Sequence, residues 1–289
     1  MKQAHRLIAL LLVLVPAGCG NNPAAQKSGP PRRDTGDESQ GHAQSETIEA
    51  LPRANRLRIA AAADLRFALP ELIAAFERMH PGATIEATYG SSGNFFSQLA
   101  NQAPFDLFLS ADIDYPKRLV EQRHGSVDGE FPYATGHIVL WAPNASSLDV
   151  EQGGLPVVID EAVKKIAIAN PNTAPYGRAA VAALKSLGVY EAVESKLVYG
   201  ENVAQAAQMV ESGAADLGII ALSLAVSPAM RDKGRYWPIP ENAHPPIVQG
   251  GVVLSWALDA NLARAFRDYL LSGGGASILR RFGFEPAGG

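Results

Sequence analysis

The folded part of the sequence alternates short apolar runs with segments whose apolar residues recur at helical spacing. The run at 57–61 comes first, and Leu69, Leu72 and Phe76 then follow three and four residues apart. Strands are expected at 57–61, 83–89, 106–109, 138–141, 165–169, 196–199, 216–221 and 248–254. Helices are expected at 69–76, 95–101, 115–122, 178–187, 203–212 and 262–270. Strands separated by helices predict an α/β fold with mostly parallel sheets that helices cover on both faces.

The composition narrows the class of protein further. A chain of 289 residues with 47% apolar residues can bury a sizeable core, which excludes disorder over the full length. The pattern is compatible with one large α/β domain or with two lobes. A single cysteine permits no internal disulfide and no thiolate-rich metal site. The net charge of −4 gives no overall positive field, so nucleic acid is not an expected partner.

The N-terminus has the pattern of a secretory signal. Lys2 and Arg6 precede an unbroken apolar run at 7–15, which is too short for a membrane-spanning helix of about 20 residues. The only cysteine, Cys19, follows two small residues at the expected cleavage point and resembles the lipidated cysteine of bacterial lipoproteins. We therefore predict a lipoprotein signal peptide at 1–18 and a periplasmic or cell-surface protein anchored through Cys19. The alternative is an ordinary cleavage region in which the cysteine has no role.

Residues 19–55 are predicted to form a disordered tether. Between 20 and 47 the sequence has no aromatic residue and no aliphatic residue larger than alanine, so it cannot bury enough surface to offset the entropy of ordering. Removal of residues 1–18 takes away two positive charges and no negative one, which changes the net charge from −4 to −6.

Four of the expected strand-to-helix turns are built from small, polar, Gly or Pro residues. They lie at 61–64, 90–93, 173–177 and 200–203. A helix N-terminus offers free N–H groups and about half a positive charge, so four that meet at one point would supply about two charges and match a small dianion. Ligands of open α/β sheets also bind beyond the carboxyl ends of the strands, where these turns lie. Ordinary helix capping explains each turn separately, and the sequence does not show whether the four converge.

Longer segments resemble the periplasmic molybdate-binding proteins of ABC importers. These segments read IAAAADLRFALPELIAAFE, TYGSSGNFFSQLANQAPFDLFLSAD, IANPNTAPYGRAAVAALKSLGVY, LVYGENVAQAAQMVESGAADLGIIALS and FRDYLLSGGGASILRRFGF. The resemblance implies a type II periplasmic binding protein, with two α/β lobes, two crossover strands and the ligand in the cleft between them. Lobe one is expected at 56–134 and 246–289, and lobe two at 135–245.

The resemblance also implies a function and a set of ligand-binding residues. The protein is expected to capture molybdate or tungstate and to deliver it, as a monomer, to the ABC permease of the inner membrane. Ser92 matches a serine that donates its hydroxyl and N–H to the oxyanion, and Tyr176 and Val203 match positions that donate backbone N–H groups. Some members add a tyrosine hydroxyl from the strand where Ala221 stands here, so that contact is expected to be absent.

The first turn departs from the family pattern. Where Ala63 and Asp64 stand, relatives usually have Ser, Thr or Asn, so a carboxylate lies beside the expected site. An ionised carboxylate cannot face a bound dianion without strong repulsion. We expect Asp64 to turn away, capping its own helix or pairing with Arg66, and to leave the backbone N–H groups of residues 63–65 as donors. The other resolution is a different ligand.

Competing chemistry has little support in the sequence. There is no GxGxxG, Walker A, HExxH or GxSxG motif, and the six histidines show no metal-ligand spacing. We therefore expect no enzyme activity, no cofactor and no metal beyond the oxyanion itself. Two alternatives stay open: the same fold with another oxyanion or with a cation attracted by Asp64, and an enzyme built on this fold.

Overall fold

The computed structural model describes residues 55–287. The predicted signal peptide at 1–18, the predicted lipidation site Cys19 and nearly all of the predicted tether at 19–55 lie outside the described residues, as do residues 288 and 289. Among the described residues, none of the helices combines the length and the hydropathy that a membrane crossing needs.

The first of two β-sheets has six strands, in the order β11-β4-β10-β3-β1-β2. The strands are β1 (Arg56–Ala62), β2 (Thr84–Gly90), β3 (Leu107–Ser110), β4 (Gly125–Gly136), β10 (Ile247–Leu254) and β11 (Glu285–Pro286). The helices of this part of the chain are η1 (Ala63–Leu65), α1 (Ala68–Met79), α2 (Ser92–Ala100), α3 (Asp114–Glu121), α9 (Ala260–Leu271) and α10 (Gly273–Arg281). The sheet therefore combines strands from both ends of the described chain.

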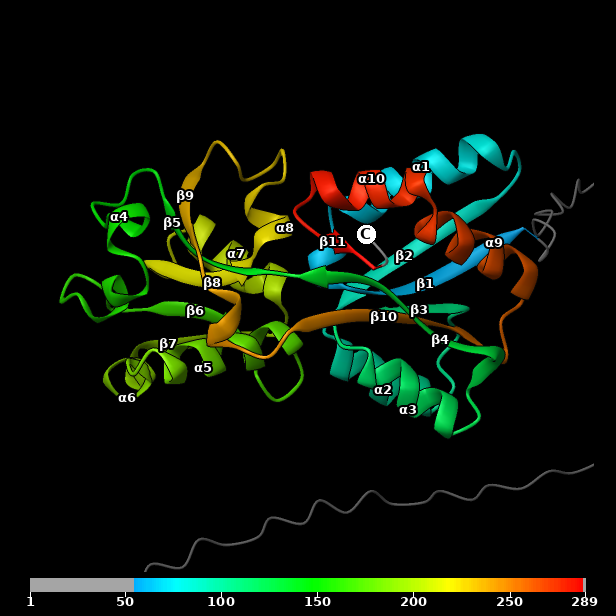
Figure 1. Ribbon diagram of the computed structural model, residues 1–289, viewed down its shortest axis with the longest axis horizontal. Coiled ribbons are helices and arrows are strands. Elements are labelled where there is room, and N and C mark those ends of the chain that lie inside the picture. The colour runs from blue at the N-terminus through cyan, green and yellow to red at the C-terminus, as the bar shows by residue number, and fades with distance from the viewer. Residues whose placement is uncertain (1–54, 288–289) are drawn as a thin grey trace, which may run out of the picture. The chain divides into compact units, whose positions relative to one another are not determined.

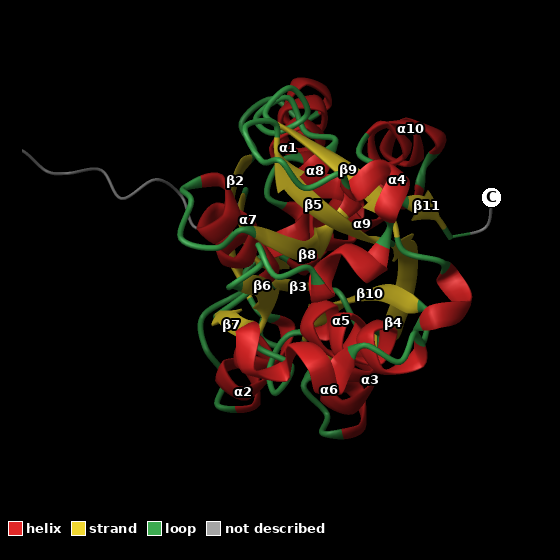
Figure 2. Cartoon of the chain, turned by 90° about the vertical axis from the view of Figure 1, so that its left-hand side faces the viewer, coloured by secondary structure: helices red, strands yellow, loops and turns green. Residues whose placement is uncertain are grey.

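The second sheet has five strands, in the order β7-β6-β8-β5-β9. The strands are β5 (Ile138–Pro143), β6 (Ile166–Ala169), β7 (Leu197–Gly200), β8 (Leu217–Ala221) and β9 (Gly234–Pro238). The helices are α4 (Val150–Gly153), η2 (Leu155–Ile159), α5 (Pro175–Ser186), α6 (Tyr190–Val193), η3 (Glu194–Lys196), α7 (Val203–Glu211), α8 (Leu222–Ala225) and η4 (Glu241–Ala243). Figure 2 shows the strands of this sheet in the middle of the view, with helices around them.

The two sheets form the two lobes of the predicted type II fold (Figure 1). The chain passes from the first lobe to the second where β4 continues through residue 137 into β5, and it returns where β9 leads through residues 239–246 into β10. In the first lobe, β4 and β10 are hydrogen-bonded neighbours. Both connections between the lobes therefore join the first lobe at adjacent strands, β4 and β10.

Both sheets are mixed, which corrects our expectation of mostly parallel sheets. In the first sheet β1 is parallel to β2 and β3, whereas β10 is antiparallel to β3 and β4. In the second sheet β6 is parallel to β7 and β8, whereas β5 is antiparallel to β8 and β9. Four of the antiparallel strands, β4, β5, β9 and β10, connect the lobes, and the fifth, β11, is the short C-terminal strand beside β4. They do not belong to strand–helix–strand units, so the rule that makes such strands parallel does not apply to them.

All the strands and helices that we expected are present, with ends shifted by a few residues. The sequence did not predict β4, β9, β11, α10 or the short helices α4, α6 and α8. The segment of β4 contains three glycines and a proline, residues that are depleted in strands, and its pairing with β10 is interrupted by two register shifts. This strand therefore lacks the regular alternation by which a strand is recognised in a sequence.

One close backbone contact positions the start of α5 beside the end of β6. A Cβ atom on Gly177 would lie 2.1 Å from the carbonyl oxygen of Ala169, so only glycine permits this approach. Pro175 occupies the first turn of the same helix, where a missing N–H group leaves no hydrogen bond unmade. Together these residues place Tyr176 at the end of the second sheet that faces the first lobe.

Candidate functional site

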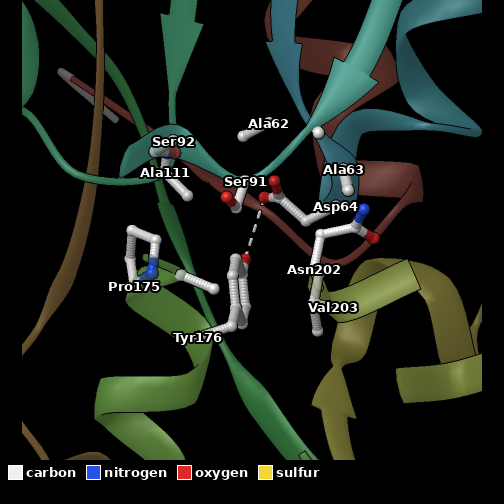
Figure 3. Close-up of a pocket in the computed structure, with 12 residues that line it drawn as sticks. Ala62, Ala63, Asp64, Ser91, Ser92, Ala111, Pro175, Tyr176, Asn202 and Val203 are labelled. Carbon is white, nitrogen blue, oxygen red and sulfur yellow. Dashed lines mark hydrogen bonds between the residues drawn. The ribbon is translucent and has the colours of Figure 1, made fainter. Parts of the chain in front are cut away.

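The four turns singled out in the sequence meet at one small pocket between the two lobes (Figure 3). The lining residues are Ala62, Ala63, Asp64, Gly90, Ser91, Ser92, Ala111, Ala174, Pro175, Tyr176, Asn202 and Val203. All five residues predicted to bind a ligand, which are Ala63, Asp64, Ser92, Tyr176 and Val203, are among them. The fold thus brings together residues that are separated by up to 140 positions in the chain.

Three of the four turns open helices of nine or more residues. Ser92 is the first residue of α2, Tyr176 is the second of α5, and Val203 is the first of α7. N–H groups in a first helical turn have no acceptor within their own helix, so they are available to a ligand. The first turn differs from our expectation because it leads only into the three-residue η1, and α1 begins later, at Ala68. The pocket therefore receives three α-helix N-termini rather than four.

The side chains at two of these N-termini have different tasks. The Asn202 carboxamide oxygen accepts hydrogen bonds from the N–H groups of Ala204 and Gln205, so this side chain caps α7. The Ser92 hydroxyl oxygen accepts a hydrogen bond from the Ala111 N–H at 2.9 Å. A hydroxyl group that accepts one bond keeps its own hydrogen, so Ser92 can still donate to a ligand.

Ser91 was not predicted as a site residue. It is 3% exposed, lines the pocket, and its hydroxyl has no hydrogen-bond partner among residues 55–287. The sequence offers two adjacent serines in the GSSG turn, and the family resemblance selects only the second. A buried hydroxyl without a partner is costly, which makes Ser91 a further candidate to bind a ligand.

Asp64 does not turn away from the pocket, which corrects our expectation. The side chain is 1% exposed, and its Oδ2 accepts hydrogen bonds from the Tyr176 hydroxyl at 2.9 Å and from the Gln249 carboxamide. Arg66 is exposed, and no ion pair joins it to Asp64 within the described chain. A buried carboxylate requires hydrogen-bond donors, and the side-chain donors that reach Asp64 are on α5 and β10, while the backbone N–H groups of Asp64 and Leu65 in η1 also favour its charged form.

The Gln249 side chain belongs to a longer buried chain of hydrogen bonds. Its carboxamide oxygen accepts from the Tyr133 hydroxyl at 2.6 Å, and its Nε2 group donates to Asp64 and to the Tyr176 hydroxyl. Tyr133 lies on β4 and Gln249 on β10, the two strands that lead between the lobes. No pattern in the sequence identifies these partners, because Asp64 and Gln249 are 185 residues apart.

Burial dominates the electrostatics of this cluster. It raises the pKa of Asp64 to about 6, although the hydrogen bonds from Gln249 and Tyr176 act in the opposite direction. Burial and the nearby charge of Asp64 also raise the pKa values of Tyr176 and Tyr133 well above their usual range, so both hydroxyls stay protonated. The pocket is lined by no Lys, Arg or His residue of the described chain.

Direct contacts hold the two lobes together around the pocket. The Gly93 N–H donates to the Thr173 carbonyl at 2.8 Å, and the Ser223 hydroxyl donates to the Asp64 carbonyl at 2.8 Å. At the rim, Arg178 of α5 forms an ion pair with Asp112 of the first lobe. The described structure is therefore a closed arrangement in which both lobes contribute to one small buried site. In residues 55–287, no three His, Cys, Asp or Glu side chains lie close enough together to hold a metal ion.

A buried pocket of N–H and hydroxyl groups, closed between two α/β lobes, is the architecture of a protein that encloses a small solute. The chain belongs to the family of bacterial extracellular solute-binding proteins, whose sequence model matches residues 57–285. It is 38% identical over 238 residues to the molybdate-binding protein ModA of Azotobacter vinelandii, which covers 82% of this chain and 92% of the relative.

Two further comparisons agree with this assignment. The chain is 35% identical over 203 residues to the molybdate-binding protein ModA of Rhodobacter capsulatus, covering 70% of this chain and 78% of the relative. The solved structure of the periplasmic molybdate-binding protein of Azotobacter vinelandii superposes with a TM-score of 0.74 at 31% identity, covering 79% of this chain and 98% of that one. The predicted family and the predicted two-lobed fold are confirmed.

We expect replacement of Asp64 to change how the stability of the ligand-free protein depends on pH. Because the pKa of Asp64 is raised from 3.8 to about 6, the folded protein binds more protons than the unfolded chain between these values. The free energy of unfolding contributed by this group therefore falls as the pH rises from about 4 to about 6, by about 3 kcal/mol in all. Asp64→Asn removes this loss, so the variant should gain stability relative to the unaltered protein as the pH rises.

Urea denaturation between pH 4 and pH 7 measures this difference. The matched control is Asp114→Asn, which removes an exposed carboxylate outside the pocket. A constant difference in stability between Asp64→Asn and the unaltered protein across this range would contradict the prediction.

Proposed function

We propose that this protein captures molybdate or tungstate between its two lobes and delivers the ion to the membrane permease of an ABC importer. The observation that carries the proposal is the meeting of three α-helix N-termini and two serine residues at one buried pocket. Relatives at 38% and 35% identity that are named as molybdate-binding proteins support the choice of ligand. The same relatives support a transport protein rather than an enzyme.

The proposed ligands of the oxyanion are the backbone N–H groups of Ala63, Asp64, Tyr176 and Val203 and both the N–H and the hydroxyl of Ser92. Three helix N-termini supply about one and a half positive charges, which offset most of the charge of a dianion. Hydrogen-bond donors that come from both lobes can be satisfied together only when the lobes are closed on an ion of suitable size. Sulfate has the same shape and charge with shorter bonds, so the closed pocket would discriminate by size.

The proposed movement divides the chain at the connections between the sheets. We assign residues 56–134 and 246–289 to the first lobe and residues 135–245 to the second, and propose that the lobes separate to admit the ion. The contacts that would break on opening include the hydrogen bond from Gly93 to Thr173 and the Arg178 ion pair. The crossover strands β4 and β10 would act as the hinge.

A cation is the second candidate ligand, because the Oδ1 atom of Asp64 has no hydrogen-bond partner among the described residues. The rest of the pocket argues against it. Asp64 is the only carboxylate among the lining residues, and helix N-termini repel positive charge.

Another oxyanion could occupy the same site. Such an ion differs from molybdate in size and in protonation, so binding measurements distinguish it from molybdate.

Isothermal titration calorimetry tests the proposal with molybdate, tungstate, sulfate, phosphate and ferric citrate. We expect molybdate and tungstate to bind with submicromolar affinity and sulfate to give no response, because the donor set fits a larger tetrahedral ion. If neither molybdate nor tungstate binds, the proposed function is wrong. Binding of ferric citrate alone would support the cation candidate.

We expect Ser92→Ala to weaken molybdate binding by about 1.5 to 3 kcal/mol, the usual value of a hydrogen bond to a charged group. The matched control is Ser97→Ala, which removes an exposed hydroxyl from the same helix outside the pocket. Calorimetric titration of both variants measures the effect. Unchanged affinity in Ser92→Ala would remove its hydroxyl from the proposed site.

We further propose that residues 1–18 direct export and that Cys19 is lipidated, so that the protein acts as a monomer anchored outside the inner membrane through the tether at 19–55. Mass spectrometry of the protein from the membrane fraction should show a lipid-modified N-terminal cysteine, and Cys19→Ser should release the protein from that fraction. An unmodified thiol at Cys19 would contradict the anchor and leave the binding function unaffected.

A further inference from the structure

Two side-chain oxygen atoms of the pocket lining lack a hydrogen-bond partner among the described residues although both are buried. They are the Oδ1 atom of Asp64 and the hydroxyl oxygen of Ser91. Figure 3 shows the hydrogen bond that joins the Asp64 carboxylate to the Tyr176 hydroxyl, and the Ser91 side chain among the residues that line the same pocket. The other carboxylate oxygen, Oδ2, already accepts two hydrogen bonds. The unsatisfied side of Asp64 is therefore the one left for a ligand.

The hydrogen bonds around Asp64 determine where a proton can be held. The Tyr133 hydroxyl donates to the Gln249 carboxamide oxygen at 2.6 Å, with the Ser110 carbonyl a more distant acceptor at 3.2 Å, so the Nε2 group of Gln249 faces Asp64 and Tyr176. The Tyr176 hydroxyl accepts from Gln249 and directs its own hydrogen to Oδ2. In this arrangement both neighbours of Oδ2 act as donors, so Oδ1 is the carboxyl oxygen left to carry a proton.

A bound oxyanion would present further acceptors to Oδ1. Two acceptor oxygens in contact need a hydrogen between them, and a fully deprotonated oxyanion such as molybdate brings none. We propose that the pocket binds its oxyanion together with one proton, which is taken from solvent, held on Oδ1 of Asp64 and donated to an oxygen of the ligand. This inference rests on the proposed function, because it assumes that the oxyanion occupies this pocket.

No other group of the surrounding elements titrates in place of Asp64. The ionisable residues of these elements are Arg56 and Arg58 on β1, Arg66 after η1, Glu86 and Tyr89 on β2, Asp128, Glu130 and Tyr133 on β4, Tyr176, Arg178 and Lys185 on α5, and Glu211 on α7. Of these, only Tyr176 lines the pocket. Burial raises the pKa values of the three tyrosines, that of Tyr89 to about 12, so they remain neutral. Glu86 and Glu211 form ion pairs with Arg56 and Lys233 outside the pocket.

The uptake of a proton is the less costly way to place an anion beside Asp64. Because burial raises the pKa of this carboxyl to about 6, protonation at pH 7 reduces the affinity only about tenfold. Repulsion between an ionised carboxylate and a dianion at contact distance corresponds to at least about a thousandfold at an effective dielectric constant of 20.

Calorimetry of molybdate binding in buffers with different ionisation enthalpies counts the protons directly. With the unaltered protein we expect uptake of close to one proton per molybdate at about pH 7.5, less uptake near pH 5, and an affinity that falls about tenfold for each pH unit from about 7 to 8.5. Asp64→Asn should bind with no proton uptake and with an affinity independent of pH. The control Asp114→Asn should behave like the unaltered protein.

The possible outcomes separate this inference from the proposed function. Tight molybdate binding by the unaltered protein without proton uptake would overturn the inference and leave the function standing. Proton uptake that persists in Asp64→Asn would also overturn it, because another group would then hold the proton. Absence of molybdate binding at every pH would refute the proposed function and the inference together. The proton count on the unaltered protein does not depend on whether the variant folds.

Discussion

The buried carboxylate of Asp64 is hydrogen-bonded by the Tyr176 hydroxyl from the second lobe and by the Gln249 carboxamide from a strand that connects the lobes. Both bonds end on the same oxygen atom, Oδ2 of Asp64. They therefore link the first lobe to the second lobe and to a connecting strand, and the relative position of these parts defines the pocket. Because the carboxylate is removed from water, each donor is needed to reduce the cost of burying the charge. The hydrogen bond from Tyr176 to Asp64 therefore depends on the two lobes lying together as they do in this structure.

The proposed anion site has no positively charged side chain in its lining, which distinguishes it from a surface that attracts anions through lysine and arginine. Peptide N–H groups at the starts of α2, α5 and α7 are fixed by their helices and need no reorganisation when a ligand arrives. The ion pair between Arg178 and Asp112 lies at the rim, where it stabilises closure. In this arrangement the negative net charge of the chain is no obstacle, because the local dipoles act at much shorter distances.

The sequence predicted the elements of the fold better than the way they pair. The strands at β1, β3, β6 and β8 are short buried apolar runs, and the helices between them have a clear apolar face, so local patterns are sufficient. The strand β4 was missed because its glycines, its proline and the bulges opposite β10 obscure the pattern. The mixed character of both sheets depends on which strands pass between the lobes, and a local pattern does not contain that information.

By itself, the sequence determined the α/β class, the family and the four turns that line the pocket, because helix starts and buried strands are encoded by neighbouring residues. Only the tertiary structure decided that the turns meet at one pocket, that Ser91 lines it beside Ser92, and that Asp64 takes its side-chain hydrogen bonds from Tyr176 and Gln249 rather than from Arg66. The physical reason is that a buried charge takes its donors from whichever elements the fold brings within reach. Those partners are 112 and 185 residues away from Asp64 in the chain.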